Sequence, residues 1–375
     1  MGQAKRIFID NFGFKNRGDQ LMIQSVLDQI QERFPNSKVF LRKNVFLENP
    51  TYCINNHLYP LRPNNKVWPF FRLLNFLLRG DWFATPNQID VVLDCCGYHI
   101  TDTWLGDESG DAYEKYYARF NKRGRKIIFL PQAFGPFNNI GTLKTMRLVH
   151  RLAALIYARD AVSKNYIEAA CGEDEKVKVA PDFTCLCPAS LNPVVQLVPK
   201  QYVAVIANFN MVYHTSKDVG ENYMNFMAAI INHLIKKGEQ VYLCNHEGER
   251  DEELLHQINQ QIVHPLPILT NLSGIDVKAV IRDSKLLITA RYHGLVSALT
   301  QGVPALCTTW SHKYAELLNE FACPESILDV TDIEGCISMI DDALNSPNKY
   351  ISPKENRVNI ENKTKTMWNE ISRIL

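Results

Sequence analysis

Two kinds of hydrophobic pattern alternate along this chain. Short apolar runs bounded by polar residues, such as residues 286–290, are typical of buried parallel strands. Longer stretches carry apolar residues at helical spacing. One of them starts after residue 293 and ends at Gly302 and Pro304, which together form a helix stop signal. A second short apolar run follows at 305–308, so this part of the chain predicts a strand, a tight turn, a helix and a second strand.

The same alternation covers most of the chain and predicts its fold class. Further strands are expected at 6–10, 89–94, 126–130, 176–182, 202–207, 240–244 and 267–269, and further helices at 19–34, 222–236, 251–263, 276–282, 332–344 and 356–375. The pattern breaks in a loose, proline-containing stretch from Pro188 to Pro199 and then restarts. We therefore expect an α/β protein with two doubly wound, Rossmann-like parallel sheets that face each other across a cleft. The expected domains are 1–195 and 196–350, followed by a C-terminal helix at 351–375. This helix could cross back and pack on the first domain.

Polar residues gather where predicted strands end and helices begin. Arg291, Tyr292 and His293 lie at the carboxyl end of one strand and at the start of the next helix. In open parallel sheets ligands bind at this edge, because free backbone N–H groups and the helix dipole favour an anion there. Arg291 and His293 would add charge to a site suited to a carboxylate or a phosphate. The alternative is an arginine that caps a surface turn and a histidine that fills a corner of the core.

Other junctions of this kind carry further candidate residues. Gly18 and Asp19 follow the first strand, and Asp19 is either a first-turn helix acid or a proton donor or acceptor that the glycine turn brings close to a ligand. His99 and Asp102 follow another strand, beside small residues that let a ligand approach the backbone; the alternative is a packed loop with a core histidine. Arg159 is either an anion ligand or the ion-pair partner of a nearby acid.

Composition narrows the class of protein without identifying it. The 375 residues exceed what one hydrophobic core usually organises, which favours two domains. A hydrophobic content of 46% with 22% charged residues is ordinary for a globular protein, and a net charge of +1 gives no argument for nucleic acid or membrane partners. The ten cysteines are scattered without zinc-type spacing, and no secretory signal opens the sequence, so the cytoplasm is the expected compartment.

The most apolar and aromatic stretch of the chain lies at 66–79. It is shorter than the ~20 apolar residues that span a bilayer, so a helix packed between other elements is the first interpretation. The alternative is a peripheral helix at a membrane surface, with Lys66, Arg72 and Arg79 near lipid headgroups.

Taken together, a set of motifs resembles the polysaccharide pyruvyl transferase family. The motifs are Asn16-Arg17-Gly18-Asp19 before a helix, Pro131-Gln132-Ala133-Phe134-Gly135-Pro136, Ala158-Arg159-Asp160 followed by Ser163, and Arg291-Tyr292-His293-Gly294 followed by Gly302-Val303-Pro304 and Lys313. Their order and spacing agree with the family from about residue 10 to about residue 320, and the joint match is more specific than any single motif.

This resemblance implies a fold similar to that of glycosyltransferase type B enzymes, with 1–195 on the acceptor side and 196–350 on the donor side. It implies that phosphoenolpyruvate gives its pyruvyl unit to two hydroxyls of a sugar, in a glycan or a lipid-linked saccharide, forming a cyclic pyruvate ketal and releasing phosphate. A role in capsule or exopolysaccharide biosynthesis, in the cytoplasm or at the inner face of the plasma membrane, would follow. With the residues above, the candidate set has Asp19 and His293 as catalytic residues and, as substrate-binding residues, Arg159, Arg291, Lys313, Gly18, Tyr292, Gly294, His99 and Asp102.

The chemistry of such a transfer fits these residue types. Phosphoenolpyruvate carries a carboxylate and a phosphate, so its site needs several fixed cations and N–H donors. Its methylene carbon must be protonated and the sugar hydroxyl deprotonated, which requires an acid and a base. We assign His293 as the proton donor and Asp19 as the base, and the reverse assignment stays open. No metal ion or organic cofactor is expected, because no carboxylate cluster has metal-ligand spacing.

Two other hypotheses compete with pyruvyl transfer. The first is a sugar-nucleotide-dependent glycosyltransferase of the same architecture, because the arginine and lysine would serve a nucleotide diphosphate equally well. The second is a non-catalytic saccharide-binding scaffold, although such a protein need not keep all four chemical types found at Asp19, Arg159, His293 and Lys313.

Overall fold

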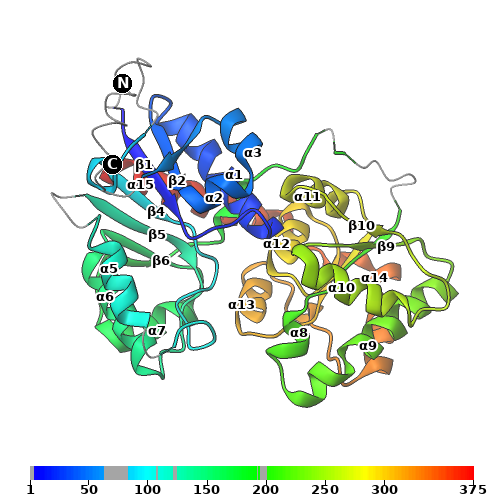
Figure 1. Ribbon diagram of the computed structural model, residues 1–375. Helices are drawn as coiled ribbons and strands as arrows, with labels where there is room; N and C mark the ends of the chain where they lie inside the picture. Colours follow the sequence, from blue (N-terminus) through cyan, green and yellow to red (C-terminus); the bar gives the residue numbers. More distant parts are fainter. Residues whose placement is uncertain (1–3, 63–82, 107–108, 121–124, 192, 195–200) are drawn as a thin grey trace. The chain divides into compact units, whose positions relative to one another are not determined.

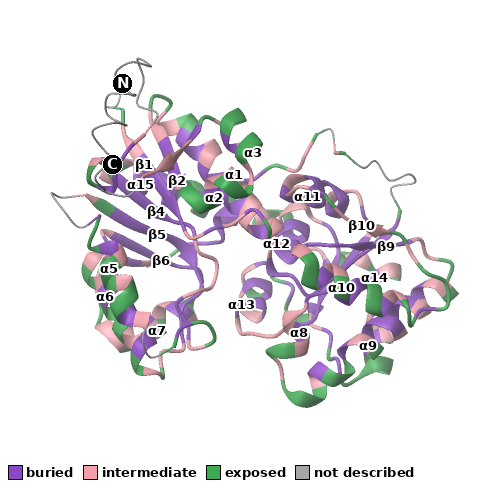
Figure 2. Ribbon diagram, viewed as in Figure 1, coloured by how far each residue is buried: buried purple, intermediate pink, exposed green. Residues whose placement is uncertain are grey.

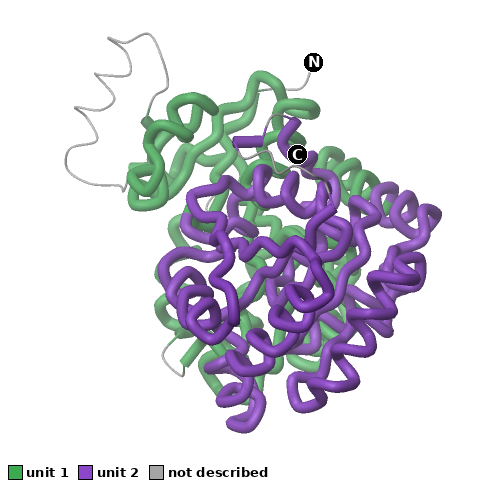
Figure 3. The backbone as a smooth tube through the Cα atoms, turned by 90° about the vertical axis from the view of Figure 1, so that its right-hand side faces the viewer, with its two compact units in different colours: residues 1–14, 22–183, 363–375 green, residues 15–21, 184–362 purple. Residues whose placement is uncertain are grey.

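The computed structural model describes the chain except for residues 1–3, 63–82, 107–108, 121–124, 192 and 195–200 (Figure 1). The chain forms two compact units (Figure 3). Unit 1 comprises Met1–Phe14, Met22–Phe183 and Lys363–Leu375, and unit 2 comprises Lys15–Leu21 and Thr184–Asn362. The domain boundaries expected from the sequence stay predictions. The apolar stretch at 66–79, for which a membrane contact was considered, lies outside the described residues.

Unit 1 is built on a seven-stranded sheet with the order β3-β2-β1-β4-β5-β6-β7, in which every pair of neighbours is parallel. Its strands are β1 (Arg6–Asp10), β2 (Lys38–Arg42), β3 (Leu58–Leu61), β4 (Val91–Asp94), β5 (Lys126–Gln132), β6 (Leu155–Ala158) and β7 (Val177–Val179). Its helices are α1 (Arg17–Arg33), which begins in unit 2, α2 (Lys43–Glu48), α3 (Pro50–Asn55), α5 (Ser109–Tyr117), α6 (Ile140–Leu152), α7 (Ala161–Cys171) and the end of α15 (Lys354–Ile374).

Helices cover both faces of this sheet, which explains why its central strands are apolar almost throughout. On one face Phe8 and Phe129 pack with Tyr117 of α5, Met146 of α6 and Ile167 of α7. On the other face α1 and α15 are tied together by a hydrogen bond of 2.6 Å from Arg33 Nη1 to Asn369 Oδ1. Figure 2 shows the strands buried and the exposed residues concentrated on the outer sides of the helices.

Unit 2 is built on a five-stranded parallel sheet with the order β10-β9-β8-β11-β12. Its strands are β8 (Val203–Ile206), β9 (Val241–Cys244), β10 (Ile268–Leu269), β11 (Leu286–Thr289) and β12 (Ala305–Cys307). Its helices are α8 (Asn210–Tyr213), α9 (Lys217–Lys236), α10 (Gly248–Asn259), α11 (Gly274–Arg282), α12 (Tyr292–Gln301), α13 (Lys313–Glu320), α14 (Ile333–Asn345) and the first part of α15. The described part of the chain also contains the short 3₁₀ helices η1 (Pro86–Gln88), η2 (Phe183–Leu186), η3 (Pro324–Ser326) and η4 (Pro347–Tyr350).

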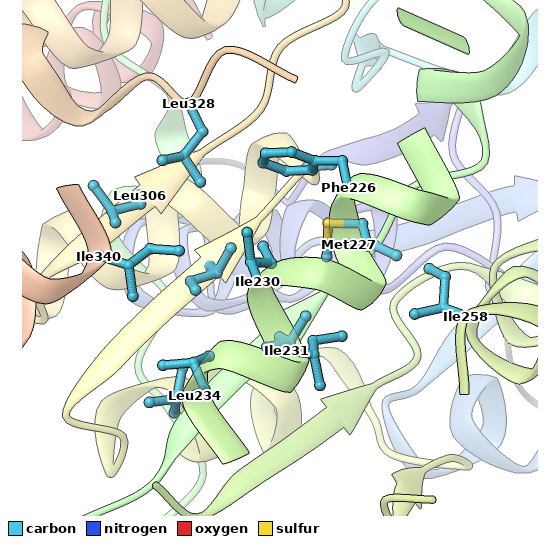
Figure 4. Packing of buried hydrophobic residues seen from close by; sticks show 14 of the residues in the cluster. Phe226, Met227, Ile230, Ile231, Leu234, Ile258, Leu306, Leu328 and Ile340 are labelled. Carbon is cyan, nitrogen blue, oxygen red and sulfur yellow. The ribbon is translucent and has the colours of Figure 1, made fainter. Parts of the chain in front are cut away.

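Successive residues of the unit 2 strands enter two different cores. On one face Leu286 and Ile288 pack with α9, α10 and α14, and Figure 4 shows Phe226, Ile230 and Leu234 of α9 in this cluster. On the other face Leu287 packs with α11, α12 and α13. This period of two is what a strand covered by helices on both faces requires.

The fold class expected from the sequence is confirmed: both units are doubly wound α/β units of the Rossmann type. Several boundaries differ from the expectation. Strand β5 continues two residues further, through Pro131 and Gln132, and α9 begins at Lys217, where the Ser216 side chain accepts the N–H of Val219 and caps the helix. Within the described part of the chain no helix is both long and apolar enough to cross a membrane.

Candidate functional site

The polar residues after β11 lie at the topological switch point of the unit 2 sheet. The strand order reverses between β8 and β11, since β9 and β10 follow on one side of this pair and β12 on the other. The chain turns from β11 into α12 within a few residues, and Thr289 Oγ1 accepts the N–H of Arg291 at 3.0 Å. A Cβ at Gly294 would stand 3.0 Å from the same oxygen, so glycine allows the first turn of α12 to lie close to the strand. This edge therefore offers the helix N–H groups and dipole that bind anions.

Arg291 is held in a buried ion-pair network. Its Nε donates to Asp251 Oδ2 at 2.7 Å, its Nη2 donates to Asp251 Oδ1, and its Nη1 donates to Glu247 Oε2. Arg291 is 7% exposed and Asp251 of α10 is fully buried. Burial lowers the pKa of Arg291 to about 10, whereas the carboxylate of Asp19 acts in the opposite direction, so the guanidinium stays charged at neutral pH. A fork-shaped guanidinium with these partners positions α10 against the start of α12.

The turn that carries Gly18 and Asp19 belongs to unit 2 and lies against His293. The N–H of Arg17 donates to the carbonyl of His246 at 3.0 Å, which anchors the turn at the end of β9. A Cβ at Gly18 would overlap the His293 ring, standing 2.8 Å from its Cγ. Only glycine permits this approach, and the next residue along the chain is Asp19. The two residues predicted to serve as acid and base are therefore brought into one unit.

His246 adds a second histidine that the sequence reasoning did not select. It is 2% exposed and lies near Arg17, Arg291 and His293. Burial, followed by the charges of Arg291, His293 and Arg17, holds the pKa of His246 well below its usual range, so this imidazole is neutral at physiological pH. Its Nδ1 has no hydrogen-bond partner among the described residues.

Lys313 begins α13 and is enclosed by aromatic rings. Its Nζ lies 4.1 Å from the ring centroid of Trp310, 5.7 Å from that of Tyr292 and 5.6 Å from that of Tyr314. The residue is only 7% exposed. Cation–π contacts of this kind stabilise a desolvated ammonium group. Tyr314 is fixed in turn, because its hydroxyl donates to the carbonyl of Ala290 at 2.7 Å.

Arg159, predicted as an anion ligand, belongs to unit 1. It is 4% exposed, and its Nη1 donates to Asp182 Oδ2 at 3.1 Å, an acid that is 1% exposed. Its backbone N–H donates to the carbonyl of Gln132 at 3.0 Å. The ion-pair interpretation therefore describes its contact with Asp182, and a role as an anion ligand stays a prediction.

His99 and Asp102 also belong to unit 1. The His99 ring stacks on Tyr113 with a centroid distance of 6.1 Å, and burial, then the charge of Arg42, lowers its pKa. The carboxylate of Asp102 accepts the N–H groups of Asn138 and Asn139, at 2.6 and 3.2 Å. Asp102 thus orders the loop before α6, and substrate binding by either residue stays a prediction.

The structure gathers part of the predicted set and adds residues to it. Unit 2 contains Gly18, Asp19, Arg291, Tyr292, Gly294, His293 and Lys313, whereas unit 1 contains His99, Asp102 and Arg159. The residues missed were His246, Glu247 and Asp251, which hold or adjoin Arg291 and His293. The signal for His246 and Glu247 was their position directly after a predicted strand, but the sequence does not show that β9 neighbours β8 in the sheet.

The fold is shared with sugar-nucleotide enzymes of the glycosyltransferase type B architecture. The UDP-GlcNAc 2-epimerase of Neisseria meningitidis, solved with UDP-GlcNAc, matches with a TM-score of 0.63 at 14% identity over 99% of this chain and 100% of that chain. HepE of Anabaena, solved with UDP and glucose, matches with a TM-score of 0.61 at 12% identity over 99% of both chains. MnaA of S. aureus, solved with UDP, matches with a TM-score of 0.59 at 13% identity over 98% of this chain and 97% of that chain. At these identities the likeness shows the fold alone.

Sequence comparison identifies the family. No curated protein was found to match the sequence. The family model for polysaccharide pyruvyl transferase matches residues 16–312, which extends from the turn before Asp19 to the residue before Lys313 and covers most of the chain. The resemblance seen in the motifs is thereby confirmed, and the chain belongs to the polysaccharide pyruvyl transferase family.

Proposed function

We propose that this protein transfers the pyruvyl unit of phosphoenolpyruvate to two hydroxyls of one sugar, forming a cyclic ketal and releasing phosphate. The observation that carries the proposal is the contact between the Gly18 turn and His293 at the start of α12. It supports an acid and a base acting together beside an anion-binding helix terminus. Membership of the family supplies the substrate class, a polysaccharide or its precursor.

The proposed reaction balances without a redox partner. A proton is added to the methylene carbon of phosphoenolpyruvate, the neighbouring carbon accepts the first sugar hydroxyl, and the bond from that carbon to the phosphate oxygen breaks. The second hydroxyl of the same sugar then closes the ring at the same carbon. Of the two hydroxyl protons lost, one balances the proton added to carbon and the other leaves with phosphate. His293 is the proposed proton donor and Asp19 the proposed base.

Donor binding is proposed to use cations and N–H groups of unit 2. The N–H groups at the start of α12 and the ammonium of Lys313 suit the phosphate and the carboxylate. Arg17, whose pKa is lowered chiefly by burial, supplies a further guanidinium in the same turn as Asp19. Arg291 is proposed to act by holding α10 and α12 together, because its N–H groups already bond to Asp251 and Glu247.

Phosphate release from phosphoenolpyruvate, measured with a mixture of saccharide acceptors, tests the proposal. His293→Ala and Asp19→Asn should each reduce turnover by about 10²-fold or more, the usual contribution of a general acid or base. Two controls match these changes. Asp218 is a first-turn acid of α9 as Asp19 is of α1, and His233 of α9 pairs with Asp341. Asp218→Asn and His233→Ala should keep wild-type turnover.

The outcome separates catalysis from helix stabilisation. A first-turn acid stabilises its helix by about 0.3–1 kcal/mol through the dipole, so both aspartate variants should lose similar stability. Near wild-type turnover in Asp19→Asn or His293→Ala would contradict that residue's catalytic role. No phosphate release by the wild-type protein with any acceptor would contradict the reaction itself.

The second candidate is glycosyl transfer from a sugar nucleotide. It is favoured by the shared fold with proteins that were solved with UDP or UDP-GlcNAc. Thermal shift measurements with phosphoenolpyruvate, inorganic phosphate, UDP-galactose and GDP-mannose separate the two, because a ligand that binds only the folded protein stabilises it by RT ln(1 + [L]/Kd). Stabilisation by phosphoenolpyruvate and not by either sugar nucleotide supports pyruvyl transfer, and the reverse result supports glycosyl transfer.

A further inference from the structure

Unit 1 has a topological switch point of its own, and charged side chains occupy it. The order of its sheet reverses between β1 and β4, with β2 and β3 on one side and β5 to β7 on the other. Asp10 and Asp94 are the last residues of these two strands and are partners in the sheet register. They are each only 1% exposed. The two carboxyl groups are therefore buried side by side, at the edge where open α/β sheets bind ligands. Packing alone does not explain this, because burying a carboxyl group costs free energy.

Hydrogen bonds order this cluster densely. Arg42, the last residue of β2, bonds through Nε and Nη2 to the carboxylate of Asp10 and through Nη2 to Asn11 Oδ1 at 2.7 Å. The hydroxyl of Tyr116 donates to Asp10 Oδ2 at 2.6 Å. Asn11 adopts a positive φ of 57°, which turns the chain sharply after β1. Asparagine tolerates this left-handed conformation better than most other residues.

Asp94 is surrounded by donors on both oxygens. Its Oδ2 accepts from the Tyr117 hydroxyl at 2.6 Å and from Asn11 Nδ2 at 2.5 Å. Its Oδ1 accepts from the N–H of Cys96 at 3.2 Å and from Gln132 Nε2 at 3.2 Å. The contact with Gln132 fixes the orientation of that side-chain amide, because its NH₂ group is committed to Asp94.

The carbonyl end of the Gln132 amide has no such partner. Gln132 is fully buried at the end of β5, and its Oε1 forms no hydrogen bond with any described residue. A buried amide oxygen left without a donor costs about 1–3 kcal/mol, so the cluster is complete only when something donates to it. The missing group is a hydrogen-bond donor.

The surroundings indicate which donor fits. The Arg42 side chain is 36% exposed and packs on Tyr116 at 4.4 Å from the ring centroid, and His99 stacks on Tyr113 beside it. These half-buried rings give the cluster an aromatic rim, a surface on which sugar rings pack. Two carboxyl groups face one guanidinium, so acceptors exceed cations and a phosphate would be repelled. Neutral hydroxyl groups, which donate, suit this balance.

We propose that the Asp10, Asp94 and Gln132 cluster of unit 1 is a subsite for a neutral sugar, with Gln132 Oε1 accepting a hydrogen bond from one of its hydroxyls. Asp94 is a positioning residue that aims the Gln132 amide. This inference rests on the proposed function in taking that sugar as the acceptor of the pyruvyl unit. Binding of the sugar itself depends only on unit 1.

The experiment titrates methyl glycosides of galactose, glucose and mannose into the full chain, with saturation-transfer NMR as the readout. At least one glycoside should bind the wild-type protein in the millimolar range. Gln132→Met keeps the length of the side chain and removes the amide oxygen, and it should weaken that binding at least tenfold. Asp94→Asn should weaken it as well, by releasing the amide that Asp94 orients. Gln24→Met, in α1 of the same unit, is the matched control and should bind as the wild type does.

A cooperative thermal unfolding transition without ligand shows that Gln132→Met is folded, and stabilisation by phosphoenolpyruvate should remain unchanged in it. The proposal is overturned if folded Gln132→Met binds the glycoside within twofold of wild type. It is equally overturned if no glycoside binds the wild-type protein, or if inorganic phosphate displaces the bound glycoside from the cluster. If glycosides bind as expected but phosphoenolpyruvate neither stabilises the protein nor releases phosphate, the subsite stands and the proposed transfer reaction fails.

Discussion

The buried carboxyl group of Asp94 should make the stability of unit 1 depend on pH. Burial and then the neighbouring Asp10 raise the pKa of Asp94 to about 6, against hydrogen bonds from Tyr117, Cys96 and Asn11 that lower it. The usual pKa of an aspartate is 3.8. Because the folded state holds this proton more tightly than the unfolded state does, the contribution of Asp94 to stability is fully present below pH 4 and is lost as the pH rises through 6.

The size of the effect follows from the two pKa values. A shift of about two pK units means that the wild-type protein loses about 3 kcal/mol of folding stability when Asp94 goes from fully protonated to fully ionised. About 2 kcal/mol of this loss falls between pH 4 and pH 7. Asp94→Asn removes the titrating group. The free energy of unfolding of this variant, relative to that of the wild type, should therefore rise by about 2 kcal/mol from pH 4 to pH 7. Any fixed mismatch between the new amide and its donors is the same at both pH values and cancels.

Hydrogen exchange read by mass spectrometry measures this difference in the full chain. Peptides from β1, β4 and β5 report the opening of unit 1, and comparing the two proteins at each pH cancels the intrinsic exchange rates. Asp174→Asn is a control that titrates outside this pH window. Hydrogen bonds from Lys176 lower the pKa of Asp174, so its contribution to stability is lost only below pH 4 and the difference between this variant and the wild type should stay constant from pH 4 to pH 8.

A stability difference between Asp94→Asn and the wild type that stays constant from pH 4 to pH 8 would refute the reasoning. It would mean that the hydrogen bonds to Asp94 balance its burial and the repulsion from Asp10, so that its pKa is the same in the folded and unfolded states. A difference that shrinks with rising pH would show that the pKa of Asp94 is lowered in the folded protein.

Three further predictions concern unit 2 and the reaction. Arg291→Met should lower the free energy of unfolding, measured in urea, by about 3–5 kcal/mol, because it leaves Asp251 buried without its cation. The double variant Arg291→Met with Asp251→Leu should lose clearly less stability, and an equal loss in the two proteins would argue against a stabilising ion pair between Arg291 and Asp251. Gly18→Ala should cost about 1–3 kcal/mol and reduce phosphate release at least tenfold, since the new methyl displaces the His293 ring, and unchanged turnover would show that this contact is not needed. Treatment with EDTA should leave phosphate release from phosphoenolpyruvate unchanged, whereas a loss restored by Mg²⁺ would show that the reaction needs a metal ion.

Hydrophobic periodicity predicted many of the long or buried elements but missed others, among them the fully buried strand β6 and the eleven-residue helix α7. The strand at 6–10 is β1 as expected, and the alternation after residue 200 corresponds to β8 through β12 with their helices. Periodicity failed for α2, α3 and β3, which are four to six residues long and too short to show a repeat. The apolar run predicts a strand that ends at Leu130, whereas β5 continues through Pro131 to Gln132.

The partners of the candidate residues were harder to predict than the residues themselves. Arg291 was found from its place after a strand, but its carboxylate partner Asp251 lies 40 positions earlier, and nothing in the local pattern joins them. Asp10 and Asp94 are likewise brought together by the order of the strands, which periodicity does not encode. In the sequence, Gln132 stands out only as one residue of the motif from Pro131 to Pro136. Its importance depends on which of its amide atoms is already bonded, and only the structure supplies this.

The division of α1 between the two units has a consequence for recombination within the family. Lys15–Leu21 belongs to unit 2, although the rest of that unit starts at Thr184. A chimaera joined near residue 184 would therefore combine His293 of one parent with the Gly18 turn of the other. An exchange of the whole of unit 2 therefore requires further crossovers before Lys15, after Leu21 and before Lys363, so that the short N-terminal insert travels with the rest of its unit. Gene fragments that begin at residue 184 would encode a sheet that lacks its proposed base.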